Sequence, residues 1–458
     1  MAEVWDAARS DAAAAAALRA AAQATLRRFP RPVPPRHELR RRKAASALRS
    51  TLARAVAAAA REGGEGNGKV PPLAYERWAA RDALRAAARA SLASELLLPC
   101  SGEADAGLAR DLARHALGAK AARDVTKQLA GAGRAAAERL AAANAAEEEE
   151  AEAEKVHCTP KGSMMAVALG APERKPYFTV SPPHLDKLQT LYLRALLPGV
   201  CSGSAESAEQ RFLRCLFVLL ARYDAAGGAG YQCALPGKGF DALREALGAS
   251  GECFASPLNC RTDAFCSAFP DVDAPFGSAG SFLDFAPARG SYEANPIFVP
   301  ETCSAMVDHM ERLLENAERR GCKKGGGDKG SGDALSFAVV VPHWEQCRFY
   351  SALCRSRFAR GAPIHVAADD HVYVDGAQHT RPMAERERPS SYATSIAVLQ
   401  TAAAARRWPL DGGRRAAIAT ALCASAGAGG ERAKSKHLRG ETRIEAIERR
   451  NKRRKRTG

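Results

Sequence analysis

Four residues near the middle of the chain, Asn295, Pro296, Ile297 and Phe298, combine groups that can hold an exocyclic amine. An adenine amino group is a poor nucleophile because its lone pair is shared with the ring. The amide oxygen of Asn295 and the carbonyl of Pro296 can accept the two hydrogens of such an amine, while Phe298 stacks on the base. Taken alone, the string is more typical of an ordinary turn after a strand.

The elements around this string indicate an α/β domain. Strand-like and helical segments alternate between residues 182 and 410, which is typical of a three-layer arrangement. The predicted strands are 231–235, 253–255, 282–285, 292–294, 335–341, 364–374 and 394–399. We also expect Ser304 to cap a helix. In such sheets ligands bind at the carboxyl ends of the strands, where Asn295 would lie.

Residues 1–181 form the first predicted region, a helical domain that ends in an acidic linker. Alanine and arginine are strong helix formers, and apolar residues recur at helical spacing in 42–60 and 78–98. The run 147–154 is acidic except for two alanines, which indicates a solvated helix or linker.

Positive charge is concentrated at the end of the chain, within the third predicted region, 411–458. The net charge is +16, and residues 431–458 hold 12 Lys and Arg against 4 Glu, so they contribute +8. This tail, disordered or helical, resembles a nuclear import signal or a phosphate-binding arm, and a merely solvated tail is the alternative. Phosphate binding of this kind would not select a base.

The composition indicates in which cellular compartments the protein is expected. No apolar run approaches the roughly 18 residues that a membrane span needs, so we expect a soluble protein without a membrane partner. The 13 cysteines stand singly, without a C-x-x-C pair. This pattern favours reduced thiols in the cytosol or nucleus over disulfides.

Ordered segments around Asn295 resemble one known family. They are 232–236, 252–260, 266–271, 276–278, 283–285, 290–296, 310–315 and 376–379. Together they are similar to the phosphorylated CTD-interacting factor family, the cap-specific adenosine N(6)-methyltransferases. The resemblance covers roughly 182–408 and is weaker before it.

The resemblance implies a function and a fold. Family members transfer a methyl group from S-adenosylmethionine to the N(6) amine of 2′-O-methyladenosine, the first transcribed nucleotide after the 7-methylguanosine cap. It implies a Rossmann-like class I methyltransferase domain at 182–410, preceded by an α-helical domain, with capped RNA bound in a groove between them. A nuclear location follows, and the phosphorylated tail of RNA polymerase II is a candidate partner.

The same resemblance assigns roles to single residues. Asn295 and Pro296 would hold the amine, with Phe298 stacked on the adenine and Ile297 beside the substrate. The methyl donor would be bordered by the turn after the first strand, which comprises Ala255, Ser256, Pro257 and Asn259. Without the surrounding matches, this Ser-Pro-x-Asn string is more typical of a plain turn.

Other candidates rest on chemistry. Asp271, Asp273 and Asp284 are alternatives for holding the donor ribose, because carboxylates accept two hydrogen bonds readily. Trp344 could stack on the cationic 7-methylguanine or be a structural tryptophan. The histidines share no ligand spacing, so we expect no metal.

The sequence departs from the family pattern at two points, and these leave other functions possible. Ile297 stands where the family has a second proline, which frees φ and makes the loop less pre-organised. The four tryptophans show no pair about 20 residues apart, so the WW domain of animal members is not evident and polymerase binding is in doubt. The alternatives are a catalytically impaired protein that binds caps or RNA, and an enzyme acting on another adenosine.

Overall fold

The computed structural model describes residues 12–63, 66–88, 97–146, 155–171, 175–196, 207–227, 232–263, 265–323 and 333–423. The acidic run 147–154 and the basic tail 431–458 lie outside the described residues. Among the described helices, none has the length and apolar content that a membrane crossing requires.

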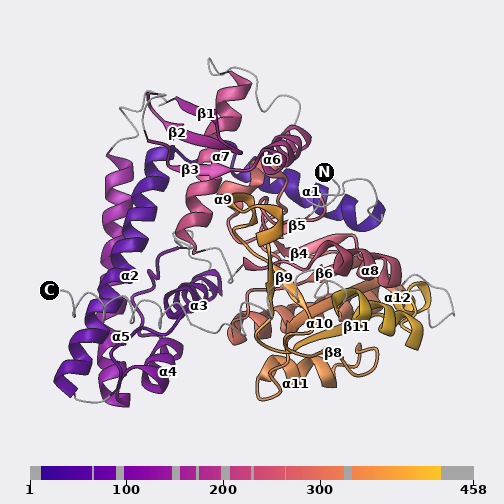
Figure 1. The fold of residues 1–458 in the computed structure, drawn as a ribbon. Helices are drawn as coiled ribbons and strands as arrows, with labels where there is room; N and C mark the ends of the chain where they lie inside the picture. The colour runs from indigo at the N-terminus through magenta and orange to yellow at the C-terminus, as the bar shows by residue number, and fades with distance from the viewer. Residues whose placement is uncertain are drawn as a thin grey trace.

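The first part of the chain is helical. Its helices are α1 (Ala12–Arg28), α2 (Pro35–Gly63), α3 (Ala74–Ala88), α4 (Ala106–His115) and α5 (Ala119–Ala145). The long helices α2 and α5 lie side by side, at the left of Figure 1. Helices α2 to α5 share a core that includes the buried Leu52, Trp78, Leu112 and Leu129. Asp105 caps α4 by accepting a hydrogen bond from the Leu108 backbone nitrogen at 2.6 Å.

A small antiparallel sheet follows where a helical region was expected. Its strands are β1 (Val156–Lys161), β2 (Met164–Leu169) and β3 (Phe178–Val180). The buried Val156, Val167 and Val180 pack on α6 (Pro182–Ala195) and α7 (Ala208–Ala225). β-branched side chains suit such a half-buried sheet, so residues 156–180 differ from the helical expectation for 1–181. The division of the chain into domains stays a prediction.

The second part of the chain is built on a six-stranded sheet. In spatial order its strands are β5 (Phe265–Ser267), β4 (Gly251–Ala255), β6 (Gly290–Ala294), β7 (Leu335–Pro342), β11 (Thr394–Gln400) and β8 (Ile364–Val366). The pairs among β5, β4, β6 and β7 are parallel, whereas β11 is antiparallel to both of its neighbours. The chain therefore has the mixed α/β fold that the alternating segments predict.

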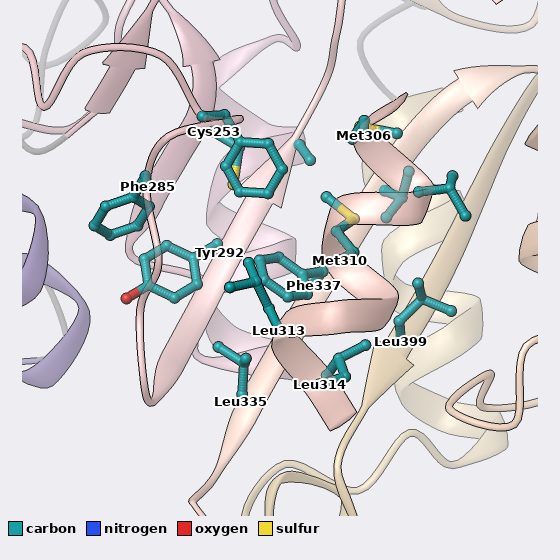
Figure 2. Packing of buried hydrophobic residues seen from close by; sticks show 14 of the residues in the cluster. Cys253, Phe285, Tyr292, Met306, Met310, Leu313, Leu314, Leu335, Phe337 and Leu399 are labelled. Atoms are coloured by element: carbon teal, nitrogen blue, oxygen red, sulfur yellow. The ribbon is translucent and has the colours of Figure 1, made fainter. Parts of the chain in front are cut away.

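Helices cover both faces of this sheet. On one face lie α1, α10 (Pro300–Lys323) and α11 (Arg348–Arg355). Figure 2 shows Tyr292 and Phe337 from the strands beside Met310 from α10, and the two rings stack at 5.8 Å. On the other face lie α8 (Gly237–Leu247) and a helix over 412–423. All eight residues of β7 are buried because both of its faces are covered.

Helix α1 belongs to the sheet rather than to the helices that follow it. Its Ala14 and Leu18 are fully buried in the core that contains Tyr292. A Cβ at Gly251 would lie 2.4 Å from a Leu18 methyl, and one at Gly290 would lie 2.9 Å from the Ala14 Cβ. Glycine is therefore needed at both positions for α1 to approach the strands.

Several predicted elements differ in the structure. Residues 282–285 form a turn rather than a strand, and Ser304 lies inside α10, which begins at Pro300. The predicted strand 364–374 is divided between β8 and β9 (Val372–Val374), and β9 pairs with β10 (Glu387–Pro389) in a separate two-stranded sheet. Within the described part of 231–235, only Ala234 makes a strand-like bridge, to Val374.

Candidate active site at the carboxyl ends of two strands

Asn295 and Ser256 directly follow two neighbouring strands of the sheet. Ser256 comes after β4 and Asn295 after β6, and these two strands are paired. The chain leaves β4 toward β5 on one side and returns to β6 on the other, so the order of strands reverses between β4 and β6. Loops at such a reversal diverge and leave room for a ligand. The structure therefore brings the Asn295 loop and the Ser256 loop to one place, as expected from the sequence.

A third segment, residues 232–234, ties the two loops together. The Asn259 side chain donates from Nδ2 to the Gln232 carbonyl at 3.2 Å, and the Asn295 side chain donates from Nδ2 to the Cys233 carbonyl at 3.0 Å. Ala234 exchanges both backbone hydrogen bonds with Val374, at 3.0 and 2.9 Å. The sequence did not predict that Cys233 contacts Asn295, although Cys233 lies within a segment that carries the family resemblance.

The Ser256 loop is closed by its own asparagine. Asn259 Oδ1 accepts hydrogen bonds from the Ser256 backbone nitrogen at 2.7 Å and from the Ser256 hydroxyl at 2.9 Å. Ala255 is half-buried, whereas Ser256 and Pro257 are buried. An asparagine that bonds a nearby backbone group fixes a turn, so this loop has a set shape.

The Asn-Pro-Ile-Phe segment makes a tight turn into α10. The Ile297 carbonyl accepts a hydrogen bond from the Val299 nitrogen at 2.7 Å, and the Val299 carbonyl accepts one from the Cys303 nitrogen at 2.9 Å. Pro296 is buried, while Asn295, Ile297 and Phe298 are half-buried. The turn is thus held by backbone hydrogen bonds in addition to the single proline.

Aromatic side chains gather around Phe298. Its ring meets Tyr392 edge-to-face at 5.7 Å and Tyr373 at 6.2 Å. Tyr392 also contacts Trp344 at 6.4 Å. The structure therefore places the predicted Phe298 and Trp344 in one aromatic cluster, joined by Tyr392. No local motif marks Tyr373 or Tyr392, so the sequence offered no signal for them.

The candidate acids occupy different environments. Both Asp271 oxygens accept hydrogen bonds from Arg222, at 3.1 and 2.8 Å, and Arg222 also donates twice to Glu38 of α2. Burial disfavours ionised Asp271, but Arg222 outweighs burial and lowers its pKa. Asp284 is exposed. Asp271 therefore serves an ion pair that links α2 to α7 and to α9 (Pro270–Asp273).

Asp273 is the buried member of the three. Its Oδ2 accepts a hydrogen bond from the Tyr223 hydroxyl at 2.7 Å, while its buried Oδ1 has no hydrogen-bond partner. Burial raises the pKa of Asp273 to about 7, whereas the nearby Ser267 and Tyr223 hydroxyls lower it. Ser267 ends β5, so this titratable group lies next to the carboxyl end of that strand.

Two buried glutamates lie side by side in β4 and β6. Glu252 and Glu293 are register partners. Glu252 Oε1 accepts from the Arg261 and Thr262 nitrogens and from the Thr262 hydroxyl. Burial raises the pKa of both, and the neighbouring Glu252 raises that of Glu293 further, well above its ordinary value. Burial thus favours the protonated form of Glu293, two residues before Asn295, which the sequence did not indicate.

The histidines near the site are joined to each other and to hydroxyl groups. His343 Nδ1 lies 2.8 Å from the Ser395 hydroxyl, 2.9 Å from the Tyr350 hydroxyl and 3.2 Å from His365 Nδ1. Within the ranges that the structure describes, no group of three or more His, Cys, Asp or Glu side chains is placed to hold a metal ion.

Comparisons with known proteins concern this part of the chain. Residues 187–376 match the family described as phosphorylated CTD interacting factor 1 WW domain. The matched residues run from α6 to β9 and include every strand of the six-stranded sheet except β11. Two curated relatives are the mRNA (2′-O-methyladenosine-N(6)-)-methyltransferases of Homo sapiens and Mus musculus. They are 38% and 36% identical over 237 residues, which is 50% of this chain and 30% of each relative. The chain thus spans under a third of the relatives' length.

Proposed function

We propose, from the relation of residues 187–376 to the phosphorylated CTD-interacting factor family, that this chain methylates the N(6) amine of the first transcribed adenosine beside an mRNA cap. The relatives are named for this activity, and the shared segment is 30% of their length. The site of this chain supports the same activity by its own geometry.

The observation that carries the proposal is the hydrogen bond between Asn295 and Cys233. Because Nδ2 is engaged by the Cys233 carbonyl at 3.0 Å, the amide presents Oδ1 as its acceptor. An acceptor so fixed can take one hydrogen of an adenine amine, and the Pro296 carbonyl can take the other. Together they localise the amine lone pair and stabilise the positive charge that develops on nitrogen during transfer.

Phe298 would position the base. The edge-to-face contacts with Tyr373 and Tyr392 hold the orientation of its ring, and adenine would stack against it. Ile297 lies in the turn between these groups, and its carbonyl is engaged by Val299. The backbone hydrogen bonds support the turn geometry that a second proline would otherwise restrict.

The methyl donor would be S-adenosylmethionine, which when bound supplies an electrophilic methyl group. The strand order β5-β4-β6-β7-β11-β8, with β11 antiparallel, supports a Rossmann-like class I arrangement. The donor would then lie at the reversal between β4 and β6, beside Ala255, Ser256, Pro257 and Asn259. The unpartnered buried oxygen of Asp273 fits a hydroxyl donor such as a ribose, whereas Asp271 is engaged by Arg222 and Asp284 stands exposed.

The substrate would be 7-methylguanosine-capped RNA. Trp344 lies in the same aromatic cluster as Phe298, so it is placed to stack on a second base or on the cationic cap. The helical part, α2 to α5, would supply further cap or RNA contacts. We also propose a nuclear location, with the basic residues 431–458 as import signal or RNA-binding arm and the phosphorylated polymerase tail as a partner.

One substrate comparison tests the proposal. The protein is incubated with labelled S-adenosylmethionine and three RNAs of one sequence: capped with a 5′ adenosine, uncapped, and with the adenosine moved inside. Methylation of the capped RNA alone is expected. Methylation of internal adenosine would redirect the target, and donor binding by calorimetry without any transfer would point to an impaired enzyme.

A further inference from the structure

The small sheet of β9 and β10 carries two arginines that share one buried carboxylate. Asp375, which follows β9, is fully buried. Arg381 Nε lies 3.1 Å from Asp375 Oδ2, and Arg388 of β10 forms an ion pair with the same oxygen. Asp375 Oδ1 accepts a hydrogen bond from the Ala377 nitrogen at 2.7 Å.

This pair of strands lies against the Asn295 loop. Val374 of β9 is hydrogen-bonded to Ala234, whose neighbour Cys233 accepts the Asn295 bond. Tyr373 of β9 contacts the Phe298 ring at 6.2 Å. Arg388 of β10 is the register partner of this Tyr373, so it lies one strand away from the residue that contacts Phe298.

Asp375 is one carboxylate shared by two guanidinium groups, so the trio of Asp375, Arg381 and Arg388 has one positive charge in excess. The segment 375–388 as a whole also holds Arg386, Glu385 and Glu387 and has no net charge. The ion pair of each arginine with Asp375 is made through Nε. Their side chains are 33% and 44% exposed, so a ligand can reach them. A guanidinium held in place by a carboxylate and open to solvent on its other edge suits a phosphate, whose oxygens accept its paired N–H groups.

We propose that Arg381 and Arg388, anchored on Asp375, bind a phosphate group of the RNA next to the target adenosine. The inference rests on the proposed function, because it places the base on Phe298 and its phosphate at the neighbouring arginines. The phosphate belongs either to the linkage that follows the adenosine or to the bridge that joins it to the cap. Either contact would set the position of the first nucleotide without reading a base.

The test measures RNA binding and methyl transfer for the full chain and two variants, Arg388→Ala and Arg381→Ala. Each variant is expected to raise the KM for capped RNA about tenfold, with kcat and donor affinity near those of the unaltered protein. The plot of log affinity against log salt should become shallower by about 0.7 for one lost phosphate contact on single-stranded RNA.

Two altered RNAs identify the phosphate. One carries an uncharged methylphosphonate after the target adenosine, and the other has a 5′ hydroxyl in place of the cap and its phosphates. The RNA that lacks the contacted phosphate should bind the unaltered protein more weakly but should bind Arg388→Ala with no further loss. If both altered RNAs weaken binding to Arg388→Ala and to the unaltered protein equally, the proposal is overturned.

Matched variants separate this role from a structural one. Arg320, near the end of α10, has a side chain that is 43% exposed and pairs with Asp333, two residues before β7 begins. Arg320→Ala therefore removes the same charge away from the site. Its RNA affinity should not change, and an equal loss would contradict the proposal.

A second pair of variants serves if Arg388→Ala loses its thermal transition. Arg388→Lys keeps the charge and should retain more RNA affinity than Arg388→Gln. If the unaltered protein binds RNA but transfers no methyl group, the proposed function fails while these binding comparisons still decide the phosphate contact.

Discussion

The Asn295 side chain and the Cys233 backbone, 62 positions apart in the chain, are joined by a hydrogen bond of 3.0 Å from Nδ2 to the carbonyl oxygen. The bond decides which end of the amide is presented as an acceptor. It also explains why the segment 232–234, which forms no strand of the central sheet, matters to the site: it connects the Asn295 loop, the Ser256 loop and β9.

Replacing Asn295 tests the amine-binding role. Asn295→Ala removes the acceptor and should abolish methyl transfer to capped RNA, a loss of at least about 100-fold in kcat. Asn295→Asp should be as inactive, because a carboxylate cannot donate to the Cys233 carbonyl and would face it at 3.0 Å. Transfer rates report the effect, and donor binding by calorimetry is the control that should stay unchanged. Full activity of Asn295→Ala would contradict the proposed role of Asn295 in binding the amine.

Replacing Ile297 with proline tests whether a more rigid turn raises the rate of methyl transfer. Ile297→Pro should be tolerated because the turn uses the Ile297 carbonyl, not its nitrogen, as a hydrogen-bonding group in the described structure. We expect a rise in kcat of up to about fivefold and a stability change within about 1 kcal/mol. Single-turnover kinetics and thermal unfolding measure the two quantities. A strong loss of activity would show that the turn requires a φ that proline cannot adopt.

Removing Arg222 of α7 should destabilise the protein far more than removing Arg42 of α2. Arg222 is buried between the buried Glu38 and the half-buried Asp271. Arg222→Met leaves Asp271 without this partner and Glu38 with its ion pair to Arg41, and should cost about 3 kcal/mol. Arg42 pairs with Asp224 across the same two helices, but the side chains are 41% and 49% exposed. Arg42→Met should therefore cost at most about 1 kcal/mol. Urea unfolding of both variants checks the contrast, and equal costs would refute it.

Asp273 should make stability depend on pH. Its pKa is raised from 3.8 to about 7, so the folded state favours the protonated acid. The stabilisation is therefore complete below about pH 4 and is lost as the pH rises toward 7. Asp273→Asn keeps a neutral side chain at every pH, so its stability relative to the unaltered protein should increase between pH 4 and 7, by several kcal/mol at most. Parallel unfolding curves at each pH measure this difference, and a constant difference would contradict the raised pKa.

The parts of the fold that were predictable are those whose signal is local. The apolar run of β7 and the position of Asn295 after β6 can be read from neighbouring residues. The Ser304 cap was wrong because α10 begins earlier, at Pro300, and the strand at 282–285 was wrong because its aromatic residues pack inward from a turn.

The parts that could not be predicted depend on contacts between distant segments. Tyr373 and Tyr392 reach Phe298 only because the strands that follow β8 fold back over the Asn295 loop. The raised pKa of Glu293 likewise results from its burial and from Glu252 of a neighbouring strand. Neither relationship leaves a pattern in the spacing of residues.

The position of α1 has a consequence for biosynthesis. Leu18 leaves the ribosome roughly 230 residues before Gly251, the residue against which it packs, and at ordinary rates of synthesis that interval is about 10 to 50 seconds. During this time the apolar side of α1 lacks its partner, so the nascent chain must keep it from aggregating, by chaperone binding or by temporary packing on α2 to α5. A fragment that starts at α6 would lack this helix from the outset, and expression of the isolated sheet region should yield insoluble protein.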